Sequence, residues 1–318
     1  MLSGIYLIIG FFILIAGANF LVEGASSLAK RLHVSDLVIG LSVVAFGTST
    51  PELFVNIFAS MQGNAAIAIG NILGSNIFNI LVIVGAASLI NPLSVTKGTV
   101  WKEIPFSLLA AIILGAMAND VLFDKMRYSL LTRIDGFILI SFFVIFIYYL
   151  FSIAKDMGMN QQTDIKQMSL VKSLGMVGGG IVGLACGGEL VQSSAVNIAS
   201  SLGVSQSLIG LTIVAAGTSL PELATSAVAA FKKNSEIAVG NIIGSNIFNI
   251  FFVLGISALI KPLPVTAQIN ADILVLLLSS IFLFLFMFTG KRRIIDRWEG
   301  AVFIALYIGY IIFLIKRG

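Results

Sequence analysis

Two nearly identical stretches, "GNILGSNIFNI" at residues 70–80 and "GNIIGSNIFNI" at residues 240–250, decide how this chain is organised. Each follows a second matched stretch, "VSDLVIGLSVVAFGTSTPE" at 34–52 and "VSQSLIGLTIVAAGTSLPE" at 204–222. One shift of 170 positions, from Gly70 to Gly240, superimposes both pairs. The chain therefore contains two copies of one unit.

The composition predicts a membrane protein. The 318 residues are 58% hydrophobic and 11% charged, with a mean hydropathy of +1.05. A soluble domain needs a larger charged exterior, and many apolar runs here approach the roughly 20 residues that cross a bilayer. We expect an all-α polytopic membrane protein with the lipid bilayer as its surroundings. The net charge of +4 then indicates orientation in the membrane, not nucleic-acid binding.

Apolar runs between polar breaks predict ten transmembrane helices, five in each copy. We expect a first unit over 1–152, a polar linker over 153–169 and a second unit over 170–318. Because five is odd, the second unit enters the membrane from the opposite side, which is the inverted repeat of many secondary transporters. The predicted spans are 4–28, 36–61, 66–90, 100–118, 134–152, 170–200, 206–230, 237–260, 270–289 and 297–315.

Positive charge gives an independent test of this topology. The loops after the odd-numbered spans hold 13 of the 19 Lys and Arg residues, against 6 on the other side. Basic loops stay in the cytoplasm, so the linker should be cytoplasmic and both termini outside the cell membrane.

Acidic residues are scarce within the spans, and two of them stand at equivalent places. Glu52 lies in "AFGTSTPEL" and Glu222 in "AAGTSLPEL". A carboxylate at membrane depth usually faces a cavity or binds a cation. The alternative is a protonated glutamate used for helix packing, but the duplicated motif brings other oxygens with each acid.

Those oxygens follow helical spacing. Thr48 and Ser49 precede Glu52 by four and three residues, so the three side chains can share one helix face. In the second copy the equivalent residues are Thr218, Ser219 and Glu222.

A proline lies beside each acid. Pro51 has no amide hydrogen and displaces the carbonyl of Gly47, so we expect the helix to open and free carbonyls around residues 45–47. Pro221 repeats this next to Gly217. Irregular backbone at membrane depth is tolerated where it lines an enclosed cavity. A simple capped kink would not explain the glutamate in each copy.

The opening motif supplies a second polar wall. Asn71, Ser75 and Asn79 recur every four residues and form one stripe of a helix, as do Asn241, Ser245 and Asn249. Asn76 and Asn246 point elsewhere, and we expect them to pack or cap. The glycines at 70, 74, 240 and 244 predict close helix packing.

The polar set consists of oxygens only, which suits hard cations such as Ca²⁺ and Na⁺. The single histidine, His33, and the single cysteine, Cys186, lie apart from it. Two carboxylates balance the charge of one Ca²⁺. No cofactor is expected, only transported ions.

With these motifs the chain resembles the cation/calcium antiporter superfamily, and within it the prokaryotic sodium/calcium exchangers. The paired "GTS-x-PE" and "GN-x-x-GSN-x-x-N" motifs match that family's two alpha repeats. The resemblance implies that the second, third, seventh and eighth helices enclose the ions, while the first and sixth form a long, tilted, sliding pair. It implies these ion-site residues: Glu52, Glu222, Thr48, Ser49, Thr218, Ser219, the carbonyls of Ala45 and Ala215, Ser75, Asn79, Ser245 and Asn249.

One position departs from the family pattern. Several relatives carry an aspartate at one of the two positions held here by Asn79 and Asn249, so this pocket has two acids instead of three. The proton-coupled branch shows "GN-x-x-E" where this chain has "GTSTPE" and "GTSLPE", which favours sodium coupling.

We therefore expect an antiporter that exchanges Na⁺ for Ca²⁺ by alternating access and serves Ca²⁺ extrusion, with no enzymatic activity and no obligate protein partner. A proton-driven Ca²⁺ exchanger is the nearest alternative, since neighbouring carboxylates can also bind protons. An oxygen-lined cation channel is a second. An intramembrane enzyme is the weakest, because Glu103 and Glu189 are isolated acids expected at helix ends or interfaces.

Overall fold

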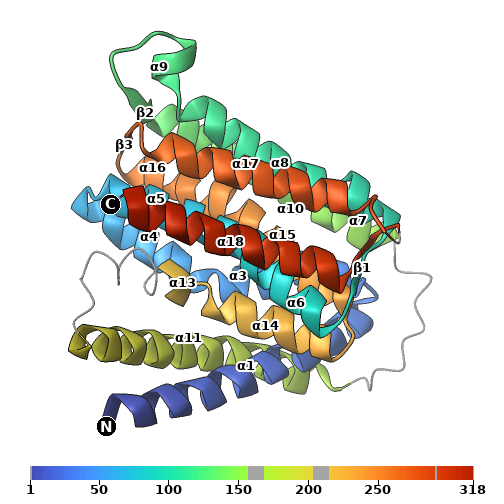
Figure 1. Cartoon of the computed structure of the whole chain (residues 1–318). Coiled ribbons are helices and arrows are strands. Elements are labelled where there is room, and N and C mark those ends of the chain that lie inside the picture. The colour runs from blue at the N-terminus through green and yellow to red at the C-terminus, as the bar shows by residue number, and fades with distance from the viewer. Residues whose placement is uncertain (1, 157–167, 203–214, 291, 318) are drawn as a thin grey trace.

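The protein is built almost wholly of helices in a computed structural model that describes residues 2–156, 168–202, 215–290 and 292–317 (Figure 1). The elements of the first half are α1 (Leu2–Leu32), α2 (Asp36–Ile39), the π-helical turn η1 (Gly40–Val44), α3 (Ala45–Thr48), α4 (Thr50–Gln62), α5 (Ala65–Phe78), the π-helical turn η2 (Asn79–Val84), α6 (Gly85–Ile90), β1 (Leu93–Ser94), α7 (Lys97–Trp101), α8 (Glu103–Met117), α9 (Asp120–Phe123), β2 (Ser129–Leu131) and α10 (Arg133–Asp156). Those of the second half are α11 (Leu170–Ser201), α13 (Ala215–Gly217), α14 (Leu220–Phe231), α15 (Ser235–Ile247), the π-helical turn η4 (Phe248–Leu254), α16 (Gly255–Ile260), β3 (Leu263–Val265), α17 (Ile269–Phe286), β4 (Ile294–Ile295) and α18 (Arg297–Arg317).

The described residues contain eight helices that are long and apolar enough to cross a membrane. The helical segments Asp36–Thr48 and Thr50–Gln62 meet at a bend of 47° and are together long and apolar enough for one further, broken span or a re-entrant loop. The predicted span 206–230 lies partly outside the described residues, and its described part is α13 and α14. The protein is thus an all-helical membrane protein with eight or nine spans in the described ranges.

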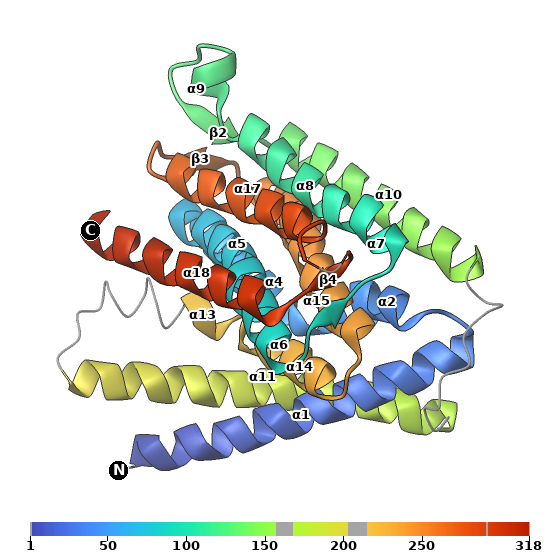
Figure 2. The ribbon, with the colours of Figure 1, turned by 45° about the vertical axis from the view of Figure 1, so that its right-hand side comes forward.

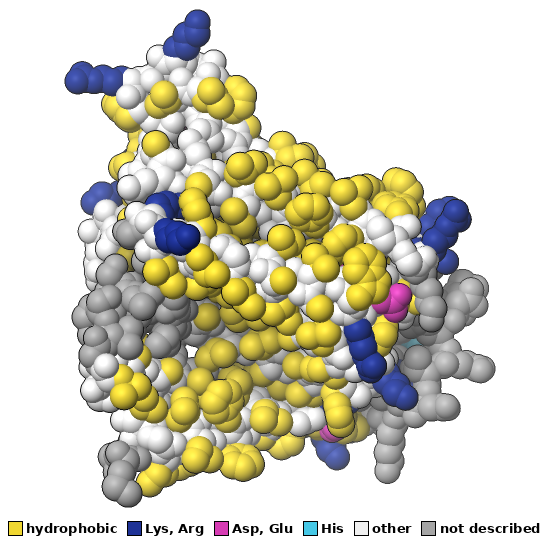
Figure 3. Space-filling model, viewed as in Figure 1, with side chains coloured by type: hydrophobic (Ala, Val, Ile, Leu, Met, Phe, Trp, Pro, Cys, Tyr) yellow, Lys and Arg dark blue, Asp and Glu magenta, His cyan; other side chains and the backbone are white. Residues whose placement is uncertain are grey.

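Burial separates central helices from outer ones. In the continuous segments Ala65–Ile90 and Ser235–Ile260, 72% and 83% of the most apolar window is buried, against 22% in α10 and in α18. The two repeated motifs therefore lie in the centre of the bundle. The outer helices turn large apolar side chains outward, and hydrophobic side chains cover the visible face between ends that carry Lys and Arg (Figure 3).

The helices α1 and α11 form a crossing pair on one side of the bundle (Figures 1 and 2). Glycines bring their backbones into contact: a Cβ added at Gly17 would lie 2.8 Å from the amide nitrogen of Leu184. One added at Gly24 would lie 2.9 Å from that of Val177, so the two helices run antiparallel. We call this contact the glycine seam.

Two short antiparallel strand pairs lie outside the spans and were not predicted. Strand β1 pairs with β4, and β2 pairs with β3, so each pair joins the first half of the chain to the second. Hydropathy does not reveal strands of two or three residues.

The expected linker over 153–169 begins later than the sequence suggested. Helix α10 continues past the apolar run to Asp156, and residues 157–167 lie outside the described ranges. The two ends of the chain, at α1 and α18, lie at the same end of the molecule, which we call the terminal end (Figure 1).

Candidate cation site

The helix that carries Glu52 is interrupted at Ser49. Helix α3 ends there, with φ −82° and ψ 9°, and α4 begins at Thr50 with Pro51 in its first turn. Of the carbonyls expected to open at residues 45–47, that of Ala45 still accepts from the amide of Ser49 at 3.0 Å, while that of Phe46 accepts from the hydroxyl of Thr50 at 2.9 Å. The second copy has the same break at Ser219, with φ −89° and ψ 5°.

The two breaks lie against each other and exchange hydrogen bonds. Ser49 Oγ donates to Glu222 Oε1 at 2.7 Å, and Ser219 Oγ donates to Glu52 Oε1 at 3.3 Å. Both glutamates are fully buried, with 0% exposure. The break in each half therefore orients the acid of the other half.

The serines of the repeated motif approach the same two carboxylates. Ser75 Oγ lies 3.2 Å from Glu52 Oε1, and Ser245 Oγ lies 3.5 Å from Glu222 Oε1. Each carboxylate thus accepts from one serine of its own half and one of the other. The predicted grouping of these four serines with the two acids is present in the structure.

Each of the two threonines bonds to an asparagine of the opposite half. Thr48 Oγ1 donates to Asn241 Oδ1 at 3.0 Å, and Thr218 Oγ1 donates to Asn71 Oδ1 at 3.2 Å. The hydroxyl of Thr48 also hydrogen-bonds to the carboxylate of Glu222. Both threonines border the site through the asparagines that begin each motif.

The two predicted backbone ligands are described unequally. The carbonyl of Ala45 lies 3.5 Å from Ser245 Oγ, the hydroxyl that also approaches Glu222, so it borders the site. Ala215 is the first residue of α13, and only its backbone is described.

Asn79 and Asn249 lie where the central helices widen into π-helical turns, a feature often found at functional sites. Asn79 Nδ2 donates to Asn246 Oδ1 at 3.0 Å, and Asn249 Nδ2 donates to Asn76 Oδ1 at 3.1 Å. Asn76 and Asn246 do take part in packing, as expected, and their contacts cross between the two halves of the chain. Each lies against the other half, where its side-chain oxygen accepts from a site asparagine.

Four buried oxygens of the site have no hydrogen-bond partner in the part of the chain that the structure describes. A buried oxygen without a donor is costly, and a bound cation would remove that cost. The set is symmetric, with one carboxylate oxygen and one amide oxygen from each half. The four are Glu52 Oε2, Glu222 Oε2, Asn79 Oδ1 and Asn249 Oδ1.

The donor set fits a hard cation. Carboxylate, hydroxyl and amide oxygens are ligands of Ca²⁺ and Na⁺. Among the described residues no group of three or more His, Cys, Asp or Glu side chains could hold a metal ion.

Sequence reasoning missed one further pair of polar residues. Asn71 Nδ2 donates to Asn56 Oδ1 at 2.7 Å, and Asn241 Nδ2 donates to Ser226 Oγ at 2.9 Å. Asn56 and Ser226 each follow a site glutamate by four residues, so helical spacing in both copies could have indicated them.

The glycines of the motif differ in their described surroundings. A Cβ at Gly240 would lie 2.9 Å from the carbonyl of Leu37, and one at Gly244 would lie 2.7 Å from that of Leu41, so close packing is confirmed there. A Cβ at Gly70 would meet nothing within 4 Å in the described chain, but positions 207 and 210, equivalent to the neighbours of Gly240, lie outside the described residues, so close packing at Gly70 stays a prediction.

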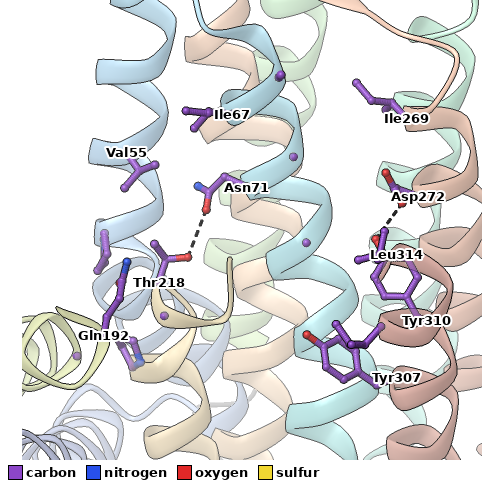
Figure 4. A pocket seen from close by; sticks show the side chains of 18 of the residues that line it. Val55, Ile67, Asn71, Gln192, Thr218, Ile269, Asp272, Tyr307, Tyr310 and Leu314 are labelled. Carbon is purple, nitrogen blue, oxygen red and sulfur yellow. Dashed lines mark hydrogen bonds between the residues drawn. The ribbon is translucent and has the colours of Figure 1, made fainter. Parts of the chain in front are cut away.

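Gly70 lines a cavity of about 630 Å³ beside the site (Figure 4). Its wall includes Asn71 and Thr218, which are bonded to each other, and it reaches Gln268 and Arg317 toward the terminal end. We call it the outer cavity. It leads from that end of the molecule to the edge of the buried oxygens.

A helical membrane bundle with two buried acids, each held by both copies of a repeated motif, is typical of an ion transporter. The chain belongs to the sodium/calcium exchanger protein family, whose sequence profile matches residues 2–152 and 172–316. The resemblance inferred from the motifs is thereby confirmed.

Individual relatives agree with this assignment. The chain is 30% identical to "Sodium/calcium exchanger MaX1" of Methanosarcina acetivorans, covering 97% of each protein. It is 35% identical to "Inner membrane protein YrbG" of Escherichia coli, over 88% of this chain and 87% of that protein. A solved structure of the sodium-calcium exchanger NCX_Mj superimposes with a TM-score of 0.82 at 35% identity and covers 98% of both chains.

Proposed function

We propose that this chain exchanges Na⁺ for Ca²⁺ across the cell membrane by alternating access. The observation that carries the proposal is the set of four unpartnered oxygens, Glu52 Oε2, Glu222 Oε2, Asn79 Oδ1 and Asn249 Oδ1, buried where both motifs meet. Family membership and the likeness to a sodium-calcium exchanger support the identity of the two ions.

The proposed architecture has ten spans in two inverted repeats, 1–152 and 170–318, joined by a cytoplasmic linker over 153–169. Two separate matches to the family profile support the division of the chain. The antiparallel pair α1 and α11, and the reciprocal bonds between the two halves, support the inversion. The distribution of basic residues supports a location of both termini outside the cell.

Ca²⁺ and Na⁺ compete for one pocket in this mechanism. Two carboxylates neutralise a single Ca²⁺, while Na⁺ must enter in several copies. The empty pocket holds two uncompensated charges in a medium of low dielectric, so it crosses poorly and exchange is favoured over leak. The proposed ligands and pocket lining are Glu52, Glu222, Thr48, Ser49, Thr218, Ser219, Ala45, Ala215, Ser75, Asn79, Ser245 and Asn249.

In the proposed orientation the outer cavity opens to the outside of the cell. It reaches Arg317, near the end of α18, and borders the site at Thr218. The structure then corresponds to a state that exchanges ions with the exterior. No cofactor takes part in this mechanism, and the chain is proposed to be a transporter without enzymatic activity.

Coupling to protons is the second candidate, since both buried carboxylates could take up a proton in place of Na⁺. The two mechanisms use the same pocket and differ in the counter-ion that is exchanged for Ca²⁺.

Radioactive Ca²⁺ uptake into proteoliposomes distinguishes them. We expect an outward Na⁺ gradient to drive uptake and a pH gradient alone to drive none; uptake driven by pH alone would reject sodium coupling. Ca²⁺ flux without any counter-ion would indicate a channel.

Variants connect the flux to the site. Glu52→Gln or Glu222→Gln should abolish exchange, whereas full activity in either would remove the proposed site. Glu103→Gln is the matched control, because Glu103 is also buried but hydrogen-bonds with Tyr149 away from the pocket.

A further inference from the structure

The described residues that line the outer cavity carry a net negative charge. Among the described residues that line it, three are charged: Glu189, Asp272 and Arg317. Arg317 binds both carboxylate oxygens of Asp272 at 3.1 Å, and Tyr310 Oη donates to Asp272 at 2.9 Å (Figure 4). Asp272 is therefore neutralised within the wall. The carboxylate of Glu189 accounts for the net charge of the lining.

Glu189 has no described partner to offset it. The two ion pairs in the described ranges are Lys232–Glu23 and Arg317–Asp272, and no hydrogen bond to Glu189 is found there. It was expected at a helix end or interface, but it lies within α11, along the cavity.

Helix α11 carries Glu189 past the break in front of Glu222. A Cβ at the neighbouring Gly188 would lie 3.7 Å from the ring of Pro221. Three residues after Glu189, the side chain of Gln192 lies over Gly217, where a Cβ would be 2.5 Å from it. Figure 4 shows Gln192 beside Thr218. Glu189 is exposed and lines the outer cavity, between two residues of α11 that lie against this break.

The other half of the chain lacks this charge. The shift of 170 that relates the two copies pairs α11 with α1 and Glu189 with Asn19. In a transporter of inverted repeats, the opposite-facing state gives each half the role of the other. Asn19 then takes the place of Glu189 beside the cavity of that state, with a neutral amide.

We propose that Glu189 attracts cations to the site from the terminal face of the membrane only, without ligating them. This inference rests on the proposed exchange and adds that the attraction of cations differs between the two faces of the membrane. A charge in a cleft with walls of low dielectric concentrates counter-ions near it. Because Ca²⁺ carries twice the charge of Na⁺, its electrostatic energy in the same potential is twice as large. The factor by which Ca²⁺ is enriched near Glu189 is therefore the square of the factor for Na⁺.

The test compares right-side-out with inverted membrane vesicles, measuring half-saturating Ca²⁺ and Na⁺ concentrations at each face. Glu189→Gln should raise the value for Na⁺ about two- to fourfold and that for Ca²⁺ about four- to sixteenfold at the terminal face. The maximal rate and the cytoplasmic-face values should stay unchanged. Choline chloride should reduce the effect by screening.

Two further variants sharpen the test. Asn19→Asp should lower the half-saturating concentrations at the cytoplasmic face. Asp124→Asn removes an exposed acid at the same end of the molecule but away from the cavity, and it should change nothing.

Equal fold-changes for Na⁺ and Ca²⁺, a shift at both faces, or a loss of maximal rate in Glu189→Gln would overturn the inference. Its failure is separable from that of the proposed function. If wild-type vesicles exchange Ca²⁺ only for protons, sodium coupling fails, and the Ca²⁺ measurements under a pH gradient still test Glu189.

Discussion

Ser49 in the first half of the chain donates a hydrogen bond of 2.7 Å to Glu222 in the second half, and both residues are fully buried. Ser219 does the same for Glu52 at 3.3 Å. Neither acid is therefore positioned by its own copy of the motif alone. A change in one break should alter the ion-binding geometry of the other half.

Ser49→Ala distinguishes a ligand from a simple hydrogen-bond donor. If Ser49 Oγ binds the ion, as proposed, its loss should raise the half-saturating Ca²⁺ concentration about tenfold, equivalent to about 1.4 kcal/mol. If it only stabilises the empty carboxylate of Glu222, its loss should tighten Ca²⁺ binding instead. Ser42→Ala is the matched control, since Ser42 Oγ donates to the carbonyl of Val38 in its own segment.

Asn249→Asp should change the charge requirement of the pocket. A third carboxylate leaves the Ca²⁺-loaded site with a net negative charge, which crosses the membrane poorly unless a monovalent cation joins it. Exchange of labelled for unlabelled Ca²⁺ should then require K⁺ or Na⁺, whereas the unmodified protein should need neither. Asn79→Asp should create the same requirement for a monovalent cation. Asn64 is exposed, and Asn64→Asp should create no such requirement. Monovalent-independent exchange in both site variants would contradict the proposed charge balance.

Gly180→Ala should destabilise the fold through the glycine seam. A Cβ there would lie 2.6 Å from the amide nitrogen of Leu21, and such overpacking costs about 1–3 kcal/mol. We expect a lower Tm in detergent. Gly179→Ala is the neighbouring control, because a Cβ there meets nothing within 4 Å, and its better helix propensity should hold or raise Tm. Equal behaviour of the two variants would show that the seam is not tightly packed.

Tyr149→Phe should reduce stability without altering transport. The hydroxyl of Tyr149 donates to Glu103 Oε1, while Glu103 Oε2 has no described partner. Removing the hydroxyl leaves a buried carboxyl group without its donor, at a cost of about 1–3 kcal/mol. The adjacent Tyr148 is 75% exposed, so Tyr148→Phe should be neutral. Thermal unfolding tests the expected loss of stability, and Ca²⁺ uptake per folded molecule tests whether transport is unchanged.

The sequence predicted the spans well because lipid-facing and central helices are both continuous apolar runs. The span predicted at 170–200 is observed as Leu170–Ser201, and the span predicted at 66–90 is observed as Ala65–Ile90. It also brought Glu52 and Glu222 together, since two buried acids in equivalent motifs point to one shared site. These inferences use periodicity and duplication, which are visible within a single chain.

Contacts between the halves were harder to foresee. Spacing on one helix shows that Asn76 points away from Ser75, but not that Asn249 of the other half lies there to bond with it. The position of the bend was hard to foresee for a related reason. Proline fixes which carbonyl loses its donor, whereas the position of the bend at Ser49 depends on packing against α14.

The glycine seam has a consequence for how the protein is made. Helix α1 is synthesised first, but the surface of α11 against which Gly17 packs follows more than 150 residues later, at Leu184. During biosynthesis α1 must therefore remain in the lipid with its glycine face uncovered until the second half is inserted. The helix bundle is therefore completed late in synthesis, when α1 and α11, the first helices of the two halves, come into contact.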